Sequence, residues 1–223
     1  PATAKRLDVH GQYVAPGFID LHLWGDPARV AHHEARTGTT GFLTAIGPQP
    51  PELLVNSLVR VEYQHDGGGA RCLGIHLEGP FLNPFRAGAL ASRWLRLPTS
   101  RELRQLLRWG DGRIKLVTVA PELPRGLEAI RWLSRRGVVV SLGHSDANDA
   151  IAQRAITAGA RAVTHVYNGM RPLHHRDPGL LGEVLTDDRL AAMVILDGVH
   201  VDPTAFQLLV RCKGPRGIIL VTD

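Results

Sequence analysis

The segment GIHLEGPF, residues 74–81, combines a buried strand with polar side chains at the end of that strand. Its apolar residues predict the strand, but His76 and Glu78 interrupt them and, lying two apart, share one face of an extended chain. The Gly-Pro pair that follows ends the strand directly after the carboxylate. Burying a lone carboxylate is costly unless a partner compensates its charge. The segment therefore predicts a strand whose carboxyl end carries a compensated glutamate.

Seven further short apolar runs flank this one, with helix-like stretches between them. Several of these stretches begin with Pro, Ser or Asp and end at Gly, as helices commonly do. Apolar strands that alternate with helices indicate parallel βαβ units, and eight such units close into a (β/α)8 barrel. An open doubly wound sheet is the alternative, but no GxGxxG motif follows its first strand. The seven runs are GFIDLHLWG, TGFLTAIG, IKLVTVAPE, VVVSLGHS, AVTHVYNG, AAMVILDGVHV and GIILVTD.

Length and composition exclude several classes of protein. With 223 residues, 44% of them hydrophobic, the chain is large enough for one domain with a real core. The net charge of +5 comes mainly from arginines interleaved with other residues along helix-like stretches, and no nucleic-acid-binding motif is present. Two distant cysteines form no disulfide framework, which indicates a reducing compartment. Without an apolar run of membrane-spanning length or a signal segment, we expect a cytoplasmic protein that binds neither membranes nor nucleic acids.

Polar residues gather at the predicted strand ends. In a barrel of this kind the active site lies at the carboxyl ends of the strands, so residues distant in sequence meet there. Histidines end two neighbouring strands, the fifth and sixth, and acids end the third and eighth, which together are typical of a metal-dependent hydrolase. The strand-end residues are Asp20, His22, His76, Glu78, His144, His165, Asp197, His200 and Asp223.

Each of these residues also has a simpler explanation. A single histidine at a strand end is more often a hydrogen-bonded loop residue than a metal ligand, and the aspartate of VTD can cap a turn. The adjacent histidines at 32–33 and 174–175 are expected at the surface or rim, because neighbouring side chains diverge. The joint pattern favours a metal, since a borderline divalent ion binds imidazole nitrogen and carboxylate oxygen. The interpretation places a cation opposite Glu78, held with His144 and His165.

Six motifs occur in an order and at a spacing that identify a family. They are HLEGPF, VTVAPE, SLGHSDA, THVYNGMRPLHHRDPG, DGVHVDP and LVTD, and the match begins at VAPGFIDLHLWG near the amino terminus. The chain resembles the N-acetylglucosamine-6-phosphate deacetylases of the amidohydrolase superfamily. The resemblance implies hydrolysis of the N-acetyl group of N-acetylglucosamine 6-phosphate, a phosphorylated amino sugar, to glucosamine 6-phosphate and acetate.

The resemblance also implies roles for individual residues. Glu78, His144 and His165 correspond to ligands of one divalent metal ion, with zinc expected and iron, cobalt or manganese as alternatives. Asp223 corresponds to the catalytic acid and base, which takes a proton from water and returns it to the leaving group. An arginine suits the phosphate because its planar fork binds phosphate through two hydrogen bonds. The implied substrate contacts are Asn168, Arg176, His200 and the backbone at Ala89 and Gly169.

Two positions depart from the family pattern. The superfamily often carries a second histidine two residues after His22 to support a second metal, but Trp24 stands there. One ion is therefore expected, with His22 as a possible ligand of a second. Leu90 stands where the family usually has a histidine that contacts substrate, which puts the rate or the substrate preference in question.

The resemblance sets further expectations for the ends of the chain and for its partners. The family has a small β-domain built from both chain ends, so residues 1–15 are expected to be its remnant or a lead-in. Residues 16–223 are expected to form a barrel truncated at both ends that lacks its last helix, and a homodimer is expected. Two alternatives remain open: an amidohydrolase of another amide or aminated ring, or an inert fragment that binds sugar phosphate. The loop NGMRPLHHRDPG argues against the first, because a phosphate-binding loop would have no purpose there.

Overall fold

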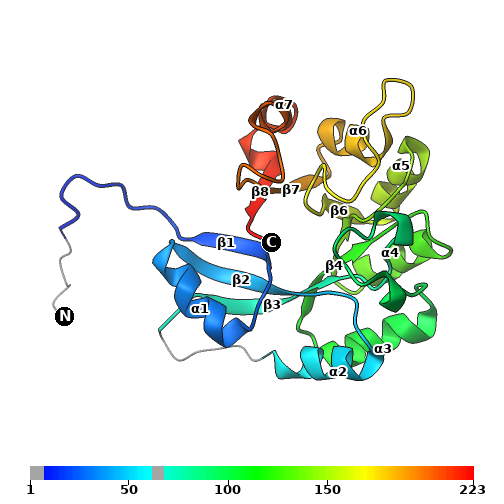
Figure 1. The fold of residues 1–223 in the computed structure, drawn as a ribbon, viewed down its shortest axis with the longest axis horizontal. Helices are drawn as coiled ribbons and strands as arrows, with labels where there is room; N and C mark the ends of the chain where they lie inside the picture. Colours follow the sequence, from blue (N-terminus) through cyan, green and yellow to red (C-terminus); the bar gives the residue numbers. More distant parts are fainter. Residues whose placement is uncertain (1–7, 62–67) are drawn as a thin grey trace.

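The computed structural model describes residues 8–61 and 68–223, which form eight parallel strands alternating with helices (Figure 1). The strands are β1 (Phe18–Leu23), β2 (Thr39–Ile46), β3 (Arg71–Glu78), β4 (Ile114–Val119), β5 (Val139–Leu142), β6 (Ala160–Val163), β7 (Ala191–Ile195) and β8 (Ile218–Val221). The helices are α1 (Pro27–Arg36), α2 (Pro51–Arg60), α3 (Ser100–Gly110), α4 (Gly126–Ser134), α5 (Asp149–Ala158), α6 (Gly179–Thr186) and α7 (Pro203–Lys213), with short 3-10 helices η1 (Pro84–Arg86), η2 (Ser92–Trp94) and η3 (Pro215–Gly217).

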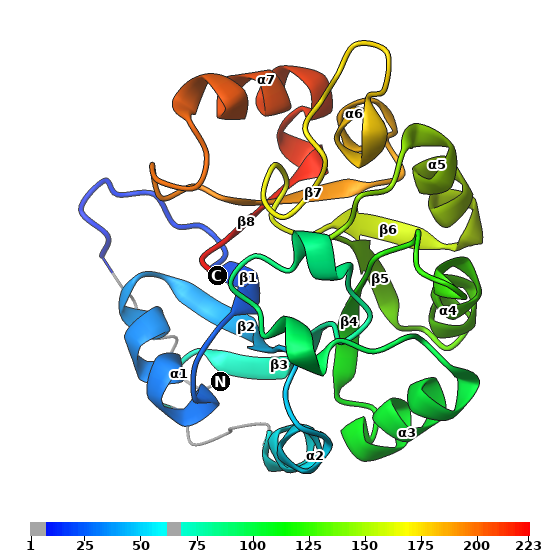
Figure 2. The same ribbon diagram turned by 45° about the vertical axis from the view of Figure 1, so that its right-hand side comes forward.

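The sheet curls until its last strand lies beside its first. The strands pair in chain order from β1 to β8, and the helices ring the outside (Figure 2). The backbone N–H of Asp223 donates to the carbonyl of His22 at 2.8 Å, and the Asp20 carboxylate accepts from the N–H and hydroxyl of Thr222 at 3.0 and 2.6 Å. The predicted (β/α)8 barrel is confirmed, and Asp20 helps to join its two edges.

Local sequence explains where the helices begin. The side chains that precede α1, α3, α5 and α7 accept hydrogen bonds from backbone N–H groups of the first turn, which otherwise have no partner inside the helix. Gly159 and Gly214 follow the ends of α5 and α7 with positive φ angles, as the predicted stop signals require. The capping side chains are those of Asp26, Thr99, Asn148 and Asp202.

Two groups of buried side chains fill the structure. The larger apolar group lies between the strands and the helices and includes Phe42, Leu54 and Ile130. A smaller one brings together residues of β2, β4, β7 and β8, namely Leu43, Leu116, Met193, Ile195 and Val221. Since neighbouring residues of a strand point to opposite faces, Phe42 packs outward and Leu43 inward. The barrel interior is therefore filled by side chains, as in other barrels of this class.

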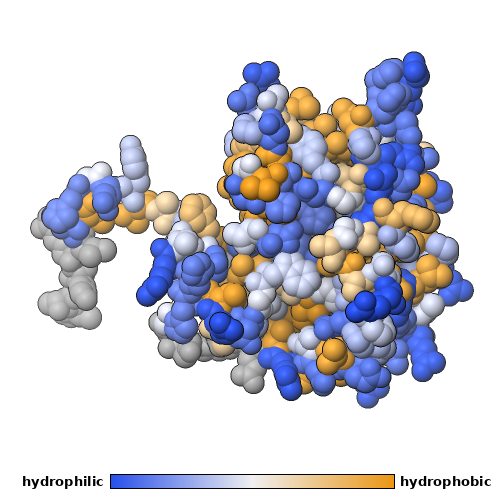
Figure 3. Space-filling model, in the orientation of Figure 1, coloured by the Kyte–Doolittle hydropathy of each residue, from blue (hydrophilic) through white to orange (hydrophobic). Residues whose placement is uncertain are grey.

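The surface and the amino-terminal segment bear on the remaining expectations. On the face shown in Figure 3, hydrophobic side chains are scattered among hydrophilic ones. No helix in the described ranges has the length and apolar character needed to cross a bilayer. Residues 8–17 run as turn and extended chain away from the barrel before β1 (Figure 1). Residues 1–7 lie outside the described part of the chain, so the assignment of residues 1–15 to a small β-domain stays a prediction.

Candidate active site

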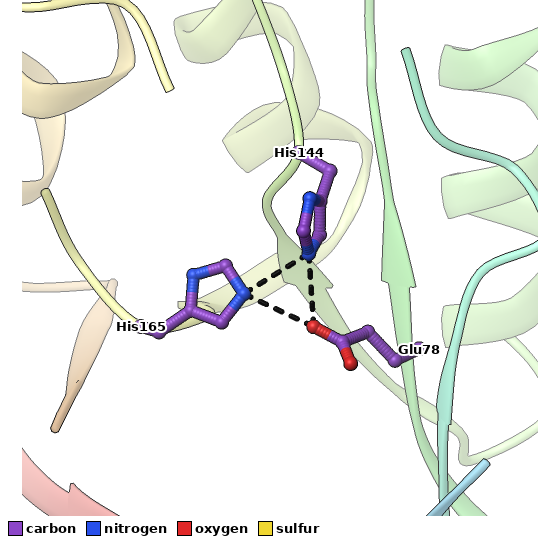
Figure 4. Close-up of side chains that lie close together, drawn as sticks. All are labelled: Glu78, His144 and His165. Atoms are coloured by element: carbon purple, nitrogen blue, oxygen red, sulfur yellow. Dashed lines mark hydrogen bonds and ion pairs between the residues drawn. The ribbon is translucent and has the colours of Figure 1, made fainter. Parts of the chain in front are cut away.

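Three of the predicted residues converge at the carboxyl ends of the strands. Glu78 is the last residue of β3, while His144 and His165 each lie two residues beyond the end of β5 and β6. All three are buried, with exposed fractions of 2%, 5% and 4%. Their side chains point toward one another (Figure 4). The structure thus brings together residues that are 87 positions apart in sequence.

Their facing atoms form a small triangle. The Nε2 atoms of His144 and His165 lie 2.9 and 3.0 Å from the Oε1 atom of Glu78, and 3.0 Å from each other. Both histidines have positive φ angles, 47° and 31°, in a backbone region that residues other than glycine seldom adopt. Unusual backbone of this kind clusters at functional sites, where the surrounding structure maintains it.

Backbone carbonyls determine which nitrogen of each imidazole faces Glu78. The Nδ1 atom of His144 lies 2.8 Å from the carbonyl of Arg86, and that of His165 lies 3.2 Å from the carbonyl of Asn168. A carbonyl oxygen can only accept, so each Nδ1 carries a proton and donates it. In a neutral imidazole the lone pair is then on Nε2, the atom that points into the triangle.

The donor set fits a divalent metal ion. With both imidazoles neutral, the triangle consists of two lone pairs and a carboxylate oxygen, which repel one another unless a cation lies between them. Tetrahedral ligands at metal distances of about 2.0–2.1 Å are separated by about 3.3 Å, close to the observed separations. The hydrogen bonds at Nδ1 are the kind of outer contact that orients histidine ligands in metal sites.

The pKa shifts of Glu78 and His165 also indicate that a positive charge is stabilised in this cluster. Burial alone would raise the pKa of Glu78, but its hydrogen-bond contacts with His144, His165 and His22 outweigh burial and hold the pKa well below its usual range. Burial would lower the pKa of His165, but the hydrogen bond and the charge of Glu78 raise it above its usual value. A proton on His165 and a metal ion are therefore alternative ways to compensate the same carboxylate.

A second group of potential ligands lies at the other oxygen of Glu78. The Nε2 atom of His22 is 3.2 Å from Oε2 of Glu78 and 3.4 Å from Oδ1 of Asp223. The indole N–H of Trp24 donates to the same Nε2 at 3.2 Å. The Nδ1 atom of His22 is buried and has no hydrogen-bond partner among the described residues. His22 therefore lacks the outer carbonyl contact that orients His144 and His165.

His76 shares the inward face of β3 with Glu78 but belongs to the barrel interior. Its Nε2 atom contacts the hydroxyl of Thr118 at 2.7 Å, and its Nδ1 atom contacts the carbonyl of Leu21 at 3.1 Å. Burial, followed by the charge of His22, holds the pKa of His76 well below its usual value. His76 is thus a neutral, hydrogen-bonded core residue that packs edge-on against the His22 ring, with ring centroids 4.4 Å apart.

A cavity of about 1010 Å³ opens above the cluster. Glu78, His144, His165 and Asp223 line it, together with an apolar wall that includes Trp24, Leu90 and Ile195. Four of the predicted substrate contacts also line the cavity, namely Ala89, Asn168, Gly169 and His200. Arg176, the fifth, is not part of the lining and is exposed on the loop after β6. The structure thus gathers the three predicted metal ligands, Asp223 and four of the five predicted substrate contacts around one cavity, whereas His22 lies behind the lining and Arg176 outside it.

Sequence reasoning missed contacts that depend on the tertiary structure. It placed Asp20 among the strand-end residues without a role, whereas its carboxylate accepts from the backbone N–H of His22 at 2.8 Å and from Thr222. It quoted VTVAPE as a motif but gave Glu122 no function, although this carboxylate binds the loop that carries His144. The two-residue spacing of Asp20 and His22 is the one local signal that pointed to the first contact.

Comparisons with known proteins all lead to one family of enzymes, although no family model matches the chain. The N-acetylglucosamine-6-phosphate deacetylase of Lysinibacillus sphaericus is 37% identical over 98% of this chain and 60% of its own length. The human protein of the same name is 38% identical over 98% of this chain and 59% of its own length. A mutant of the Mycobacterium smegmatis enzyme, solved in complex with N-acetyl-D-glucosamine-6-phosphate, is 33% identical, with a TM-score of 0.82 over 92% of this chain and 57% of its own. The chain therefore spans about three fifths of the length of the relatives it matches.

Proposed function

The chain belongs to the N-acetylglucosamine-6-phosphate deacetylase family of the amidohydrolase superfamily, and we propose that the protein removes the N-acetyl group from N-acetylglucosamine 6-phosphate. The products are glucosamine 6-phosphate and acetate. The observation that carries the proposal is the triangle of Glu78, His144 and His165 in one cavity with Asp223. A solved relative holds the phosphorylated sugar itself, which supports the substrate.

Glu78, His144 and His165 hold one divalent metal ion in this proposal. Zinc suits two imidazoles and a carboxylate, and iron, cobalt and manganese are alternatives for the same ligand types. When bound, the ion polarises the amide carbonyl and makes water acidic enough to attack it near neutral pH. The carbonyls of Arg86 and Asn168 keep both imidazoles in the tautomer that binds metal.

Asp223 moves the proton of the reaction. Its backbone N–H donates to the carbonyl of His22, its Oδ1 atom lies 3.4 Å from Nε2 of His22, and the residue lines the cavity. The carboxylate accepts a proton from the attacking water as the oxygen–carbon bond forms. It then gives the proton to the amide nitrogen as the carbon–nitrogen bond breaks, so the amine leaves as a neutral group.

The remaining cavity residues bind the sugar. The side chain of Asn168 and the backbone at Ala89 and Gly169 contact the ring and its phosphate, and His200 adds a further contact. The Nδ1 atom of His200 donates to Asp197 at 2.8 Å, which leaves its Nε2 atom to reach the substrate. Arg176, which is exposed on the loop after β6, binds the 6-phosphate from the rim in this proposal.

One observation favours a second candidate. Because Arg176 does not line the cavity, an amidohydrolase that acts on another, unphosphorylated amide would need no change in the cluster. The apolar wall at Trp24 and Leu90 is compatible with such a substrate. A third outcome, an inert fragment, is distinguished by binding of the sugar phosphate without activity.

The decisive experiment measures acetate release from N-acetylglucosamine with and without the 6-phosphate, using metal-loaded and chelator-treated protein. We expect release from the phosphorylated sugar that depends on the ion, and much slower release from the unphosphorylated one. Equal rates on the two sugars would favour the second candidate. No release by fully loaded protein that still binds the phosphorylated sugar would favour the inert fragment.

Assembly and location follow from the family in this proposal. A homodimer is checked by light scattering during gel filtration, where a single-chain mass at assay concentrations would contradict it. Cys72 is buried and Cys212 exposed, and both are free thiols, which supports a reducing compartment such as the cytoplasm. Localisation of a tagged full-length protein tests this part.

A further inference from the structure

The loop after β4 carries a carboxylate that joins two other loops of the barrel mouth. Oε1 of Glu122 accepts from the side-chain amide of Asn83 at 2.9 Å and from the backbone N–H of Asp146 at 2.6 Å. Oε2 accepts from the hydroxyl of Ser145 at 2.7 Å. Ser145 and Asp146 directly follow His144 in the chain. One half-buried side chain thus connects the loop after β3 with the loop after β5.

Both of these loops hold His144. Asn83 caps the short helix η1 from the position just before it, and its backbone N–H donates to the carbonyl of His144 at 3.0 Å. At the end of η1, the carbonyl of Arg86 accepts from Nδ1 of His144 at 2.8 Å. The segment that contains η1 lies across the mouth of the barrel (Figure 2). The imidazole is therefore oriented by an acceptor on a different loop from its own.

The side chain of Arg86 also joins the loop after β3 to the loop after β5. Its Nε and Nη2 atoms donate to Oδ1 of Asp146 at 2.9 and 2.6 Å. The carbonyl that orients His144 and the guanidinium of the same residue thus both bind the loop that carries His144. Arg171 donates to the other oxygen of Asp146 at 3.0 Å, which adds the loop after β6.

Gly169 packs against the contact between His144 and Arg86. Its φ angle is +61°, and a Cβ atom there would lie 3.0 Å from Nδ1 of His144 and 3.3 Å from the carbonyl oxygen of Arg86. Its own carbonyl accepts from the N–H of Ser145 at 3.0 Å. The ring of His144 has little room to turn on this side, so its direction depends on the position of the two loops.

From these contacts we propose that Glu122 is a positioning residue for His144, which keeps the Nε2 atom aimed at the metal by holding the acceptor of Nδ1 in place. This inference rests on the proposed metal-binding function. A carbonyl in a short surface turn is not rigid by itself, and Glu122 holds the turn at its first residue, Asn83. Loss of an outer contact to a metal ligand, here the one between Nδ1 of His144 and the carbonyl of Arg86, commonly weakens metal binding by about 10–100-fold, which sets the scale of the effect expected when Glu122 no longer holds that carbonyl.

A second carboxylate serves as a matched control. Glu102 binds Arg96 at 2.7 Å and so ties the segment after η2 to helix α3, without a contact to His144. If Glu122 only stabilises the fold, the two substitutions to alanine will act alike: both will lower the melting temperature and neither will change metal affinity. If Glu122 positions His144, only its substitution will change metal affinity.

The experiment measures the Kd for zinc by chelator competition, well below the melting temperature, and the visible absorption of the cobalt-loaded protein. Glu122→Ala is expected to weaken zinc binding by about 10–100-fold and to alter the cobalt spectrum, whereas Glu102→Ala leaves both unchanged. Glu122→Gln is expected to restore most of the affinity. Its amide oxygen can still accept from Asn83 and Asp146, and the Ser145 hydroxyl can turn to accept from the amide.

Further variants keep the inference testable if Glu122→Ala does not fold. Asn83→Asp retains the acceptor for the N–H of Phe85 but sets a carboxylate against Glu122, and we expect weaker zinc binding. Wild-type zinc affinity and cobalt spectrum in Glu122→Ala, or in Asn83→Asp, would overturn the inference. His144→Ala tests the metal-ligand role of His144 separately from the positioning role of Glu122. If His144→Ala keeps its metal, the ligand assignment fails rather than the positioning role.

Discussion

The two oxygens of Glu78 face two groups of side chains that look alike in composition but differ in their surroundings. At Oε1, His144 and His165 each donate Nδ1–H to a backbone carbonyl, so both Nε2 lone pairs converge. At Oε2, the Nε2 atom of His22 receives the N–H of Trp24, and its Nδ1 atom has no partner in the described structure. Asp223 completes the second group.

The difference shows that residue type alone does not make a metal site. Three potential ligands lie within reach of one another in both groups. Only the first has the outer hydrogen bonds that fix the tautomer and direction of each imidazole, which metal sites commonly require. This difference supports the proposal that the ion binds at the first group and that Asp223 in the second group transfers the proton. Substitutions in the two groups test this division, and a substitution of Arg176 tests the proposed phosphate contact.

The largest effect is expected from removing a ligand of the first group. His144→Ala or His165→Ala should abolish stoichiometric metal, because each substitution removes one of three protein ligands. His22→Ala, the matched change in the second group, should leave one ion per chain. Elemental analysis after dialysis measures the metal content. Normal content in either of the first two variants would refute the division between the groups.

Asp223→Asn should separate binding from catalysis. Asparagine matches the shape of the carboxylate but cannot take a proton from water, so turnover should fall by about 10²–10⁴-fold. Metal content and substrate affinity should stay close to those of the wild type, because the first group is intact. Acetate release and isothermal titration measure these quantities. Unchanged turnover would remove Asp223 from the mechanism.

Arg176→Ala tests a residue that the cavity lining does not include. A hydrogen bond to a charged group contributes roughly 1.5–3 kcal/mol, so affinity for the phosphorylated sugar should fall by about tenfold to a hundredfold. The unphosphorylated sugar should be affected little. Arg189→Ala is the control, since it removes an exposed arginine near the opposite ends of the strands. Equal losses on both sugars would exclude the phosphate role.

Trp24→His should change the second group without disturbing the first. The substitution removes the indole N–H from Nε2 of His22 and supplies a further imidazole, so a second ion should bind at raised metal concentration. The first ion should keep its Kd within about tenfold, because its outer contacts are untouched. Metal titration counts the ions, with Trp24→Phe as the control that stays at one. A single ion in Trp24→His would mean that Trp24 does not limit the second group.

The fold and the positions of the central residues were predictable from local patterns. Apolar runs separated by capped helices indicate parallel strands wherever they occur, and all parallel strands present their carboxyl ends on one side. The places of Glu78, His144 and His165 at three such ends therefore implied that they meet. The family motifs added roles for these residues, which the metal and activity measurements above will test.

The hydrogen bonds that orient the predicted metal ligands were not predictable in this way. The acceptors for His144 and His165 are backbone carbonyls, and every residue has a carbonyl, so no residue type marks Arg86 or Asn168 as the partner. The position of Arg176 outside the cavity lining likewise depends on the path of a loop. Local propensity does not determine such paths when contacts between different loops hold them.

Strand and helix periodicity depends on neighbouring residues, so the amino-acid sequence was enough to show which side chains stand at which strand ends. What these side chains can do depends on contacts that form when the chain folds. The tertiary structure placed Glu122 where one carboxylate joins two loops, and it gave His144 an outer contact that His22 lacks. The physical reason is that a lone pair is directed by hydrogen bonds from residues far apart in the chain, and folding alone brings those residues together.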